Sequence, residues 1–223
     1  MISIDTLQKS IYQKSYFTQH SSRIVKSEKQ VETGKLEKCE FRFHGTITEV
    51  SKDFLKNCRN IFCKVSKDLS FSCECDGIFL LEKDGTNYIV FVELKSNFNK
   101  RAIMQIAISD IRCKLLCCGI DGFDIDDYQE IGLIISYPPT SSVTDNSSFK
   151  LAKTEMVMEL YKRSLYALNE KLIKDKQVVL NDCSFQWKPW NVAQRIKPNN
   201  LVVKHIEVPK DMSSFSIDLE SVL

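Results

Sequence analysis

Two carboxylates and a lysine lie in adjacent apolar runs of this sequence, and their types and spacing suit a divalent cation. Asp76 lies in the run 73–81, and Glu93 and Lys95 end the run 88–95. Residues two apart on a strand point to the same face, so Glu93 and Lys95 should share a face. Mg²⁺ binds carboxylate and carbonyl oxygens and keeps positions for water and phosphate. The pattern therefore predicts metal-assisted hydrolysis of a phosphodiester, with Asp76 and Glu93 as metal ligands.

The two apolar runs must be neighbouring strands for these groups to meet. Residues 82–87 separate the runs and contain Asp84-Gly85, which is a strong signal for a tight β-hairpin. Pairing across that turn would bring Asp76 toward Glu93. The alternative is purely structural. Asp76 would form a bend with Gly77, and Glu93 would merely pair with Lys95 at a solvated strand end.

The remaining periodicity indicates an α/β fold with a central mixed β-sheet flanked by α-helices. The runs 88–94 and 131–135 are almost continuously apolar, as is typical of central strands covered on both faces. We expect an N-terminal helical extension over 1–38, a core over 39–140, and a C-terminal helix and strand over 141–223 that complete the same domain. The expected elements are a helix and connection within 1–38, a strand at 39–48, a helix at 50–62, a helix ending at 118, an acidic loop at 121–130, a strand at 131–137, a helix at 149–173, strands at 177–180 and 201–208, and a frayed or docked tail.

Composition places the chain among ordinary globular proteins. Of its 223 residues, 43% are hydrophobic, which is enough for a single-domain core. No apolar run reaches the length of roughly 18–20 residues that crosses a bilayer, so a soluble, cytoplasmic protein without a membrane partner is expected. The nine cysteines are odd in number and form no paired Cys-x-x-Cys motifs. Reduced, buried thiols are therefore favoured over disulfides or a zinc site.

The motif resembles the PD-(D/E)xK nuclease superfamily, to which many restriction endonucleases and Holliday-junction resolvases belong. The resemblance rests on Asp76, on Glu93-Leu94-Lys95 at a strand end after sixteen intervening residues, and on Gln105 in the helix that follows. It covers roughly residues 40–140. Cys75 stands where the family pattern has proline.

The resemblance implies a restriction-endonuclease-like core in which Asp76 and Glu93 bind Mg²⁺, with Mn²⁺ as a substitute. The backbone carbonyl of Leu94 would be available as a further ligand, Lys95 would orient or activate the attacking water, and Gln105 would support the site. Many members add an acidic residue from the helix before the hairpin. In this sequence Glu49 and Asp53 both remain candidates, and Glu49 is the one included in the predicted ligand set.

The expected function is therefore a Mg²⁺-dependent nuclease that hydrolyses DNA, in bacterial defence or DNA processing. Lys100, Arg101 and Arg112 are expected to contact DNA phosphates. Residues 150–210 contain twelve Lys and Arg against six Asp and Glu, which suits either a phosphate-facing surface or a solvated helical face. One such site cuts one strand, so a homodimer or a complex with a partner protein is expected. The alternative is a non-catalytic protein that keeps the nuclease fold and binds nucleic acid or a partner. A hydrolase of small phosphate esters is a third, weaker alternative.

Overall fold

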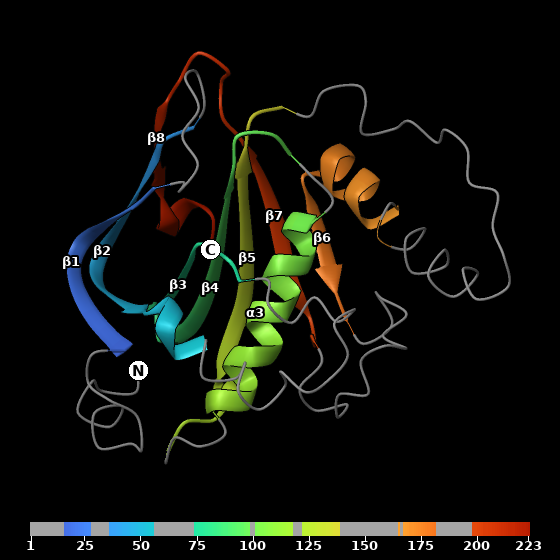
Figure 1. Ribbon diagram of the computed structural model, residues 1–223. Coiled ribbons are helices and arrows are strands. Elements are labelled where there is room, and N and C mark those ends of the chain that lie inside the picture. Colours follow the sequence, from blue (N-terminus) through green and yellow to red (C-terminus); the bar gives the residue numbers. More distant parts are fainter. Residues whose placement is uncertain are drawn as a thin grey trace, which may run out of the picture.

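The described part of the chain folds around one mixed β-sheet of eight strands (Figure 1). The computed structural model describes residues 16–27, 36–55, 74–98, 101–117, 122–138, 165, 167–181 and 198–223. The strands are β1 (Phe17–Ser27), β2 (Lys38–Val50), β3 (Gly77–Lys83), β4 (Thr86–Lys95), β5 (Tyr128–Ser136), β6 (Gln177–Leu180), β7 (Leu201–Glu207) and β8 (Ser214–Asp218); helix α3 spans Arg101–Cys117, and the short 3₁₀ helices are η2 (Ile125–Asp127) and η5 (Leu219–Ser221). Residues 52–55, 165 and 167–175 are also helical. A mixed sheet with helices is compatible with the predicted α/β class.

Seven of the strands follow the order β1-β2-β3-β4-β5-β7-β6, and β8 pairs with β2. Strand β2 is long enough to hold two partners on one edge, since β3 pairs with residues 48–50 and β8 pairs with residues 38–42. The strands β4, β5 and β7 are parallel, whereas β1, β2, β3 and β4 form successive antiparallel pairs. The C-terminal strands thus join the same sheet as the hairpin.

The predicted hairpin is confirmed. Strands β3 and β4 pair antiparallel from Gly77–Val92 to Lys83–Thr86. The turn residues Asp84 and Gly85 both have positive φ, at 51° and 77°. A two-residue turn of type I′ needs positive φ at both positions, which explains the Asp-Gly pair.

Helix α3 is the crossover that a parallel β4–β5 pair requires. It lies along one face of the sheet, in front of β5 (Figure 1). A Cβ at Gly132 on β5 would come within 2.6 Å of the Ile106 side chain, so glycine allows the helix to approach this closely. The core under α3 includes Ile78, Ile89, Phe91, Ile103 and Ile106, whereas a second core on the other face includes Phe41, Phe79, Val90, Leu94 and Leu133.

Two local predictions differ from the structure, and the tail, which was predicted to be frayed or docked, is docked. Residues 17–27 form strand β1, not a helix or connection, because they pair along β2 despite a mostly exposed surface. Strand β5 begins at Tyr128, inside the predicted acidic loop, since residues 128–130 pair with β4. The tail is docked as β8 and η5. Residues 1–15 of the predicted N-terminal extension lie outside the described residues, as do residues 56–62 and 149–164 of the helices predicted at 50–62 and 149–173. In the described part of the chain, no helix is long and apolar enough to cross a membrane.

Candidate functional site

Asp76 lies directly before β3 and is held against β4 by two hydrogen bonds. Its backbone amide donates to the carbonyl of Val92 at 2.7 Å. Its Oδ2 accepts from the backbone amide of Leu94 at 2.9 Å. The register that pairs Gly77 with Val92 continues to bring Asp76 opposite Glu93. The predicted proximity of positions 76 and 93 is therefore confirmed.

The side chains of Asp76 and Glu93 share the face of the sheet that α3 covers. Ile78 follows Asp76 by two positions, and Phe91 precedes Glu93 by two, and both belong to the core under α3. Alternation along each strand then directs both carboxylates to that same face. Leu94 faces the opposite core, as expected for the residue between Glu93 and Lys95. The backbone amide of Leu94 contacts Asp76. The role of the Leu94 carbonyl as a metal ligand stays a prediction.

Glu93 is a fully buried carboxylate. Its side chain forms an ion pair with Lys95, which is itself largely buried. Apart from that ion pair, neither oxygen of Glu93 has a hydrogen-bond partner among the described residues. The pKa of Glu93 is raised to about 8: burial is the largest cause, the charge of Asp76 adds to the rise, and Lys95 and Lys52 oppose it. A cation that bound both carboxylates would offset the cost of keeping Glu93 ionised in this buried position beside Asp76.

Two carboxylates are enough for Mg²⁺, which usually keeps several waters and takes one or two protein carboxylates plus substrate phosphate. The described residues contain no group of three His, Cys, Asp or Glu side chains that could hold a metal ion. The orphaned oxygens of Glu93 beside Asp76 therefore fit a metal that is completed by water and substrate, and they do not fit a closed structural site.

A polar stripe on α3 fixes the segment that carries Asp76. The side-chain amide of Gln105 donates to the Glu74 carbonyl at 3.1 Å. The Ser109 hydroxyl accepts from the Cys75 amide at 2.9 Å. Gln105 was predicted to support the site, and the structure places it on the backbone two residues before Asp76. Ser109 has the same role, and its spacing of four from Gln105 on one helix face was the available signal.

Arg112 continues this stripe and is fully buried. Its guanidinium donates to the Leu55 carbonyl and, at 3.1 Å, to the Glu74 carboxylate. The prediction that Arg112 contacts DNA phosphates is therefore wrong, because the side chain is enclosed and spans two loops of its own chain. Arg101 is exposed at the start of α3, and its predicted phosphate contact stays a prediction. Lys100 lies outside the described residues.

Glu49 is not brought to the carboxylate pair. It lies on β2, where Ile47 on the same side of the strand belongs to the second core, on the face opposite α3. Its carboxylate pairs with Lys26 and, at 3.1 Å, with His20, both on β1. The predicted role of Glu49 as a metal ligand is therefore wrong: the alternation of β2 turns it to the other face. Asp53, the other candidate, is exposed on the helical turn 52–55.

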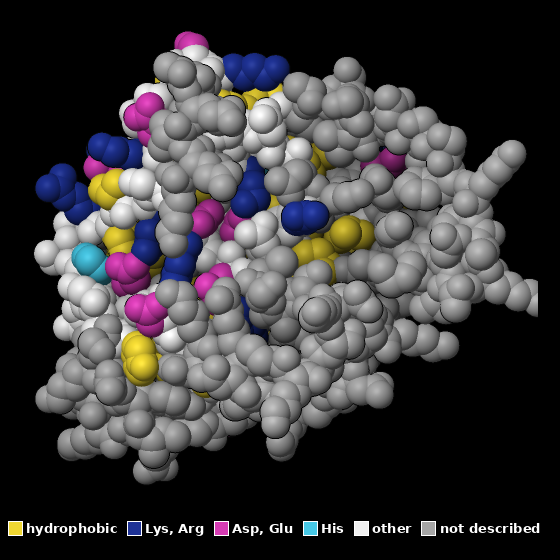
Figure 2. Space-filling view, viewed as in Figure 1, with side chains coloured by type: hydrophobic (Ala, Val, Ile, Leu, Met, Phe, Trp, Pro, Cys, Tyr) yellow, Lys and Arg dark blue, Asp and Glu magenta, His cyan; other side chains and the backbone are white. Residues whose placement is uncertain are grey.

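Charges of opposite sign are neighbours on this side of the molecule. Figure 2 shows Lys and Arg side chains lying among Asp and Glu side chains, over the region that β1 to β4 occupy in Figure 1. One such contact was not predicted: the Lys52 ammonium donates to Asp76 Oδ1 at 2.9 Å. The sequence points only weakly to this contact, because Lys52 is one of several charged residues in the predicted helix at 50–62.

A buried Ser–His pair continues the polar row along the same face. Ser136 pairs in register with Lys95, and its hydroxyl lies 2.9 Å from Nε2 of His205 on β7. Burial lowers the pKa of His205 to about 4, and Lys176 lowers it further, so the imidazole is neutral. No local spacing links these two residues, because they lie 69 positions apart in the chain and meet only through the pairing of β5 with β7.

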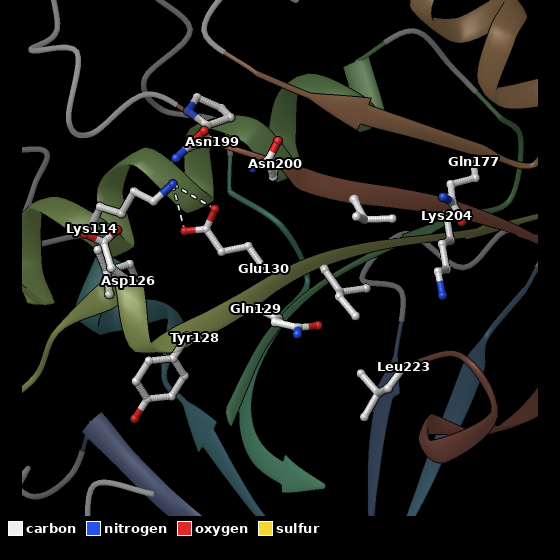
Figure 3. Close-up of a pocket in the computed structure, with 14 residues that line it drawn as sticks. Lys114, Asp126, Tyr128, Gln129, Glu130, Gln177, Asn199, Asn200, Lys204 and Leu223 are labelled. Atoms are coloured by element: carbon white, nitrogen blue, oxygen red, sulfur yellow. Dashed lines mark hydrogen bonds and ion pairs between the residues drawn. The ribbon is translucent and has the colours of Figure 1, made fainter. Parts of the chain in front are cut away.

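A cavity of about 890 Å³ lies toward the start of β5, away from Asp76 and Glu93. Figure 3 shows Lys114 of α3 and Glu130 of β5 joined at its wall. The Lys114 ammonium contacts Glu130 at 2.7 Å and Asp110 at 3.0 Å, and all three side chains are buried. Burial raises the pKa of Glu130 to about 9, and the charge of Asp110 adds to the rise. This group binds α3 to β5 and holds a proton at neutral pH.

Glu130→Gln is expected to flatten the pH dependence of stability. The pKa of Glu130 is raised in the folded state, so the folded protein retains a proton that the unfolded chain releases. This contribution is complete below pH 4.5 and is lost as the pH rises toward about 9, with a slope of at most about 1.4 kcal/mol per pH unit. Gln keeps the neutral form. Melting temperatures between pH 6 and 9 should fall less in the variant than in the wild type, and equal slopes would contradict the assignment.

No protein-family model, no curated protein and no solved structure matches this chain. The interpretation of the site therefore depends on the contacts of Asp76, Glu93 and Lys95 described above.

Proposed function

We propose that this protein is a Mg²⁺-dependent nuclease of the PD-(D/E)xK type, with a restriction-endonuclease-like core and DNA as substrate. The observation that carries the proposal is the position of Glu93: it is fully buried, its oxygens have no partner among the described residues other than the ion pair with Lys95, and Asp76 lies beside it. Holding two carboxylates together away from water is unfavourable unless a cation joins them.

The layout around the pair supports the same proposal. The hairpin of β3 and β4 carries Asp76, Glu93 and Lys95, and α3 follows it and crosses to the parallel strand β5. This layout agrees with what the resemblance implies, a hairpin that carries the charged residues followed by a helix. Gln105 lies at the predicted supporting position and contacts the Glu74 carbonyl.

The chain's own residues would divide the chemistry among them. Asp76 and Glu93 would hold Mg²⁺, which supplies charge stabilisation at the phosphate and lowers the pKa of a bound water. Lys95 contacts Glu93 and would orient the attacking water and offset the negative charge that develops on the phosphate. The amide of Leu94 fixes the Asp76 carboxylate in place. Cleavage would leave a 3′-hydroxyl and a 5′-phosphate, as the resemblance implies.

The biological setting of the proposal follows from the same resemblance. A nuclease without a separate sequence-reading module would take its specificity from DNA structure, from a second copy of itself or from a partner protein. A cytoplasmic role in bacterial defence or DNA processing is part of the proposal.

A cleavage assay tests the function directly. We expect the wild type to cut plasmid or single-stranded DNA with Mg²⁺ or Mn²⁺ and to lose this activity in EDTA. Lys95→Ala should reduce kcat/KM by about 10²-fold or more, the usual contribution of a positioned proton-transfer group. Lys38→Ala, which removes an exposed lysine of β2, should cut as the wild type does.

Two results would argue against the nuclease. Cleavage that survives EDTA or the loss of Lys95 would belong to another site or a contaminant. Metal-independent binding of DNA that persists in Lys95→Ala, with no cutting by any form of the protein, would favour the non-catalytic binding protein.

A further inference from the structure

Lys52 completes the contacts of the Asp76 carboxylate. Its ammonium donates to Oδ1 at 2.9 Å, and the backbone amide of Leu94 donates to Oδ2 at the same distance. Both oxygens of Asp76 are therefore engaged by donors of the chain. The Lys52 side chain is 28% exposed and the Asp76 side chain 17%, so the contact lies at the edge of the buried site, where solvent and ligands can reach it.

The position of Lys52 is determined by the packing of its own helical turn. The Ser51 amide donates to the Tyr16 carbonyl at 2.8 Å, and the Phe54 amide donates to the Ser51 carbonyl at 3.0 Å. Phe54 is buried against Phe17, with ring centroids 5.3 Å apart. A turn that is fixed in this way holds Lys52 toward Asp76, whereas most surface lysines are free to leave their partners.

The same turn is connected to the segment before Asp76 through α3. Arg112 donates to the carbonyl of Leu55, at the end of the turn, and to the carboxylate of Glu74. Lys52 and Asp76 are therefore positioned by one shared residue. The backbone positions from which the two side chains meet are therefore set by the fold.

Lys52 remains a cation at this position. A lysine ammonium is charged at neutral pH, and here it contacts the Asp76 carboxylate at 2.9 Å. When no metal is bound, Lys52 contacts Asp76 and Lys95 contacts Glu93. A metal ion that takes Oδ1 of Asp76 competes with the Lys52 ammonium for that oxygen. The site then holds an excess of positive charge, which an anion such as a phosphodiester would neutralise.

We propose that Lys52 couples metal binding to substrate binding: it competes with the metal for Asp76 in the free protein, and once displaced it binds a phosphate oxygen of the nucleic acid. This inference rests on the proposed function, because it takes Asp76 as a metal ligand. Metal and DNA would then each increase the affinity for the other, since binding energies at linked sites are reciprocal. The role of Lys52 is positioning and competition, distinct from the role of Lys95 beside Glu93.

Direct metal titration tests the inference without any cleavage. Mn²⁺ is titrated by calorimetry into the wild type, Lys52→Met and Lys26→Met, all free of DNA. Lys26 is a matched control, because it is a partly buried lysine paired with Glu49 on the opposite face of the sheet. Lys52→Met should bind Mn²⁺ about five-fold more tightly than the wild type or better, a typical coupling factor, and Lys26→Met should bind as the wild type does.

A second measurement addresses the phosphate contact. Binding of a fluorescent DNA oligonucleotide is measured by anisotropy for the same proteins, in Ca²⁺ in place of Mg²⁺. Lys52→Met should bind the oligonucleotide more weakly although it binds metal more tightly, and the salt dependence of binding should lose about one phosphate contact. Lys52→Arg, which keeps the charge, should restore the wild-type order of both affinities.

The outcomes separate this inference from the proposed function. Equal Mn²⁺ affinity in the wild type and Lys52→Met would overturn the role of Lys52 and leave the metal site intact. Weaker Mn²⁺ binding in a Lys52→Met protein with an unchanged melting temperature would overturn it as well. Absence of Mn²⁺ binding in every form of the protein would overturn both the metal site and the inference. Tighter metal binding joined to weaker DNA binding supports it.

Discussion

Glu93→Gln is expected to remove metal-dependent cleavage, with a fall in kcat/KM of about 10³-fold or more, because one of two metal-binding carboxylates is lost and a metal supplies several kcal/mol of charge stabilisation. The same change should leave the fold intact. Burial raises the pKa of Glu93 to about 8, so at neutral pH without metal the wild-type side chain is already largely protonated, and Gln has nearly the same shape and no charge.

Stability and activity should therefore separate in this variant. Since the folded-state pKa of Glu93 is raised, the wild type loses stability as the pH rises through about 8, and Glu93→Gln should not. Melting temperatures at pH 6 and pH 9 with EDTA, together with Mn²⁺ calorimetry and the plasmid assay, measure both properties. Glu82→Gln, at an exposed position near the turn of the same hairpin, is the control and should cut as the wild type does.

Retained cleavage in Glu93→Gln would remove the metal site from the interpretation of this protein. A variant that fails to fold would also contradict the argument, because it would mean that the charged form of Glu93 stabilises the structure through Lys95. Only lost activity with retained or increased stability agrees with a carboxylate that is kept in an unfavourable environment for function.

The hairpin and its charged residues could be predicted from sequence because the signals are local. The Asp84-Gly85 pair specifies the turn, and a two-residue turn fixes the register of β3 against β4. Once the register is fixed, the relation of Asp76 to Glu93 follows. Helix α3 could be predicted equally well, because its apolar positions repeat at spacings of three and four over one continuous segment.

The other elements of the site depend on partners that are distant in the chain. Strand β1 has few buried side chains, and it is a strand because β2 offers it an edge. The face on which Glu49 lies depends on the register of β2 against β3, and no local pattern states that register. Side chains alternate between the two faces of a strand, so a shift of one residue moves an acidic side chain from the face of the metal site to the opposite face. A family pattern that places an acidic residue before the hairpin therefore could not locate it here.

The polar stripe of α3 shows a different limit. The spacing of Gln105, Ser109 and Arg112 puts them on one face of the helix, but spacing does not show whether that face meets DNA or the chain itself. The structure answers this through Glu74, whose carbonyl and carboxylate bind two members of the stripe. The stripe holds the loop before Asp76, so its residues act on the site through the backbone.

Arg112→Met is expected to lower the free energy of unfolding by about 3–5 kcal/mol, the usual result of removing one partner of a buried ion pair. Met keeps much of the side-chain volume and removes the charge and the donors. The Leu55 carbonyl and the Glu74 carboxylate lose the donor that they share, and both lie in the interior, with 10% of the Glu74 side chain exposed. Chemical denaturation monitored by circular dichroism measures the loss.

Two further variants decide what the loss means. Arg112→Met combined with Glu74→Gln should recover part of the stability, because the second change removes the carboxylate that the first left without its ion-pair partner. Arg101→Met, at the exposed start of the same helix, should change the free energy of unfolding by no more than about 0.5 kcal/mol. If Arg112→Met folded as stably as the wild type and instead weakened DNA binding, Arg112 would be a nucleic-acid contact after all. A large loss of stability that Glu74→Gln partly restores identifies it as the residue that joins the Lys52 turn to the Asp76 loop.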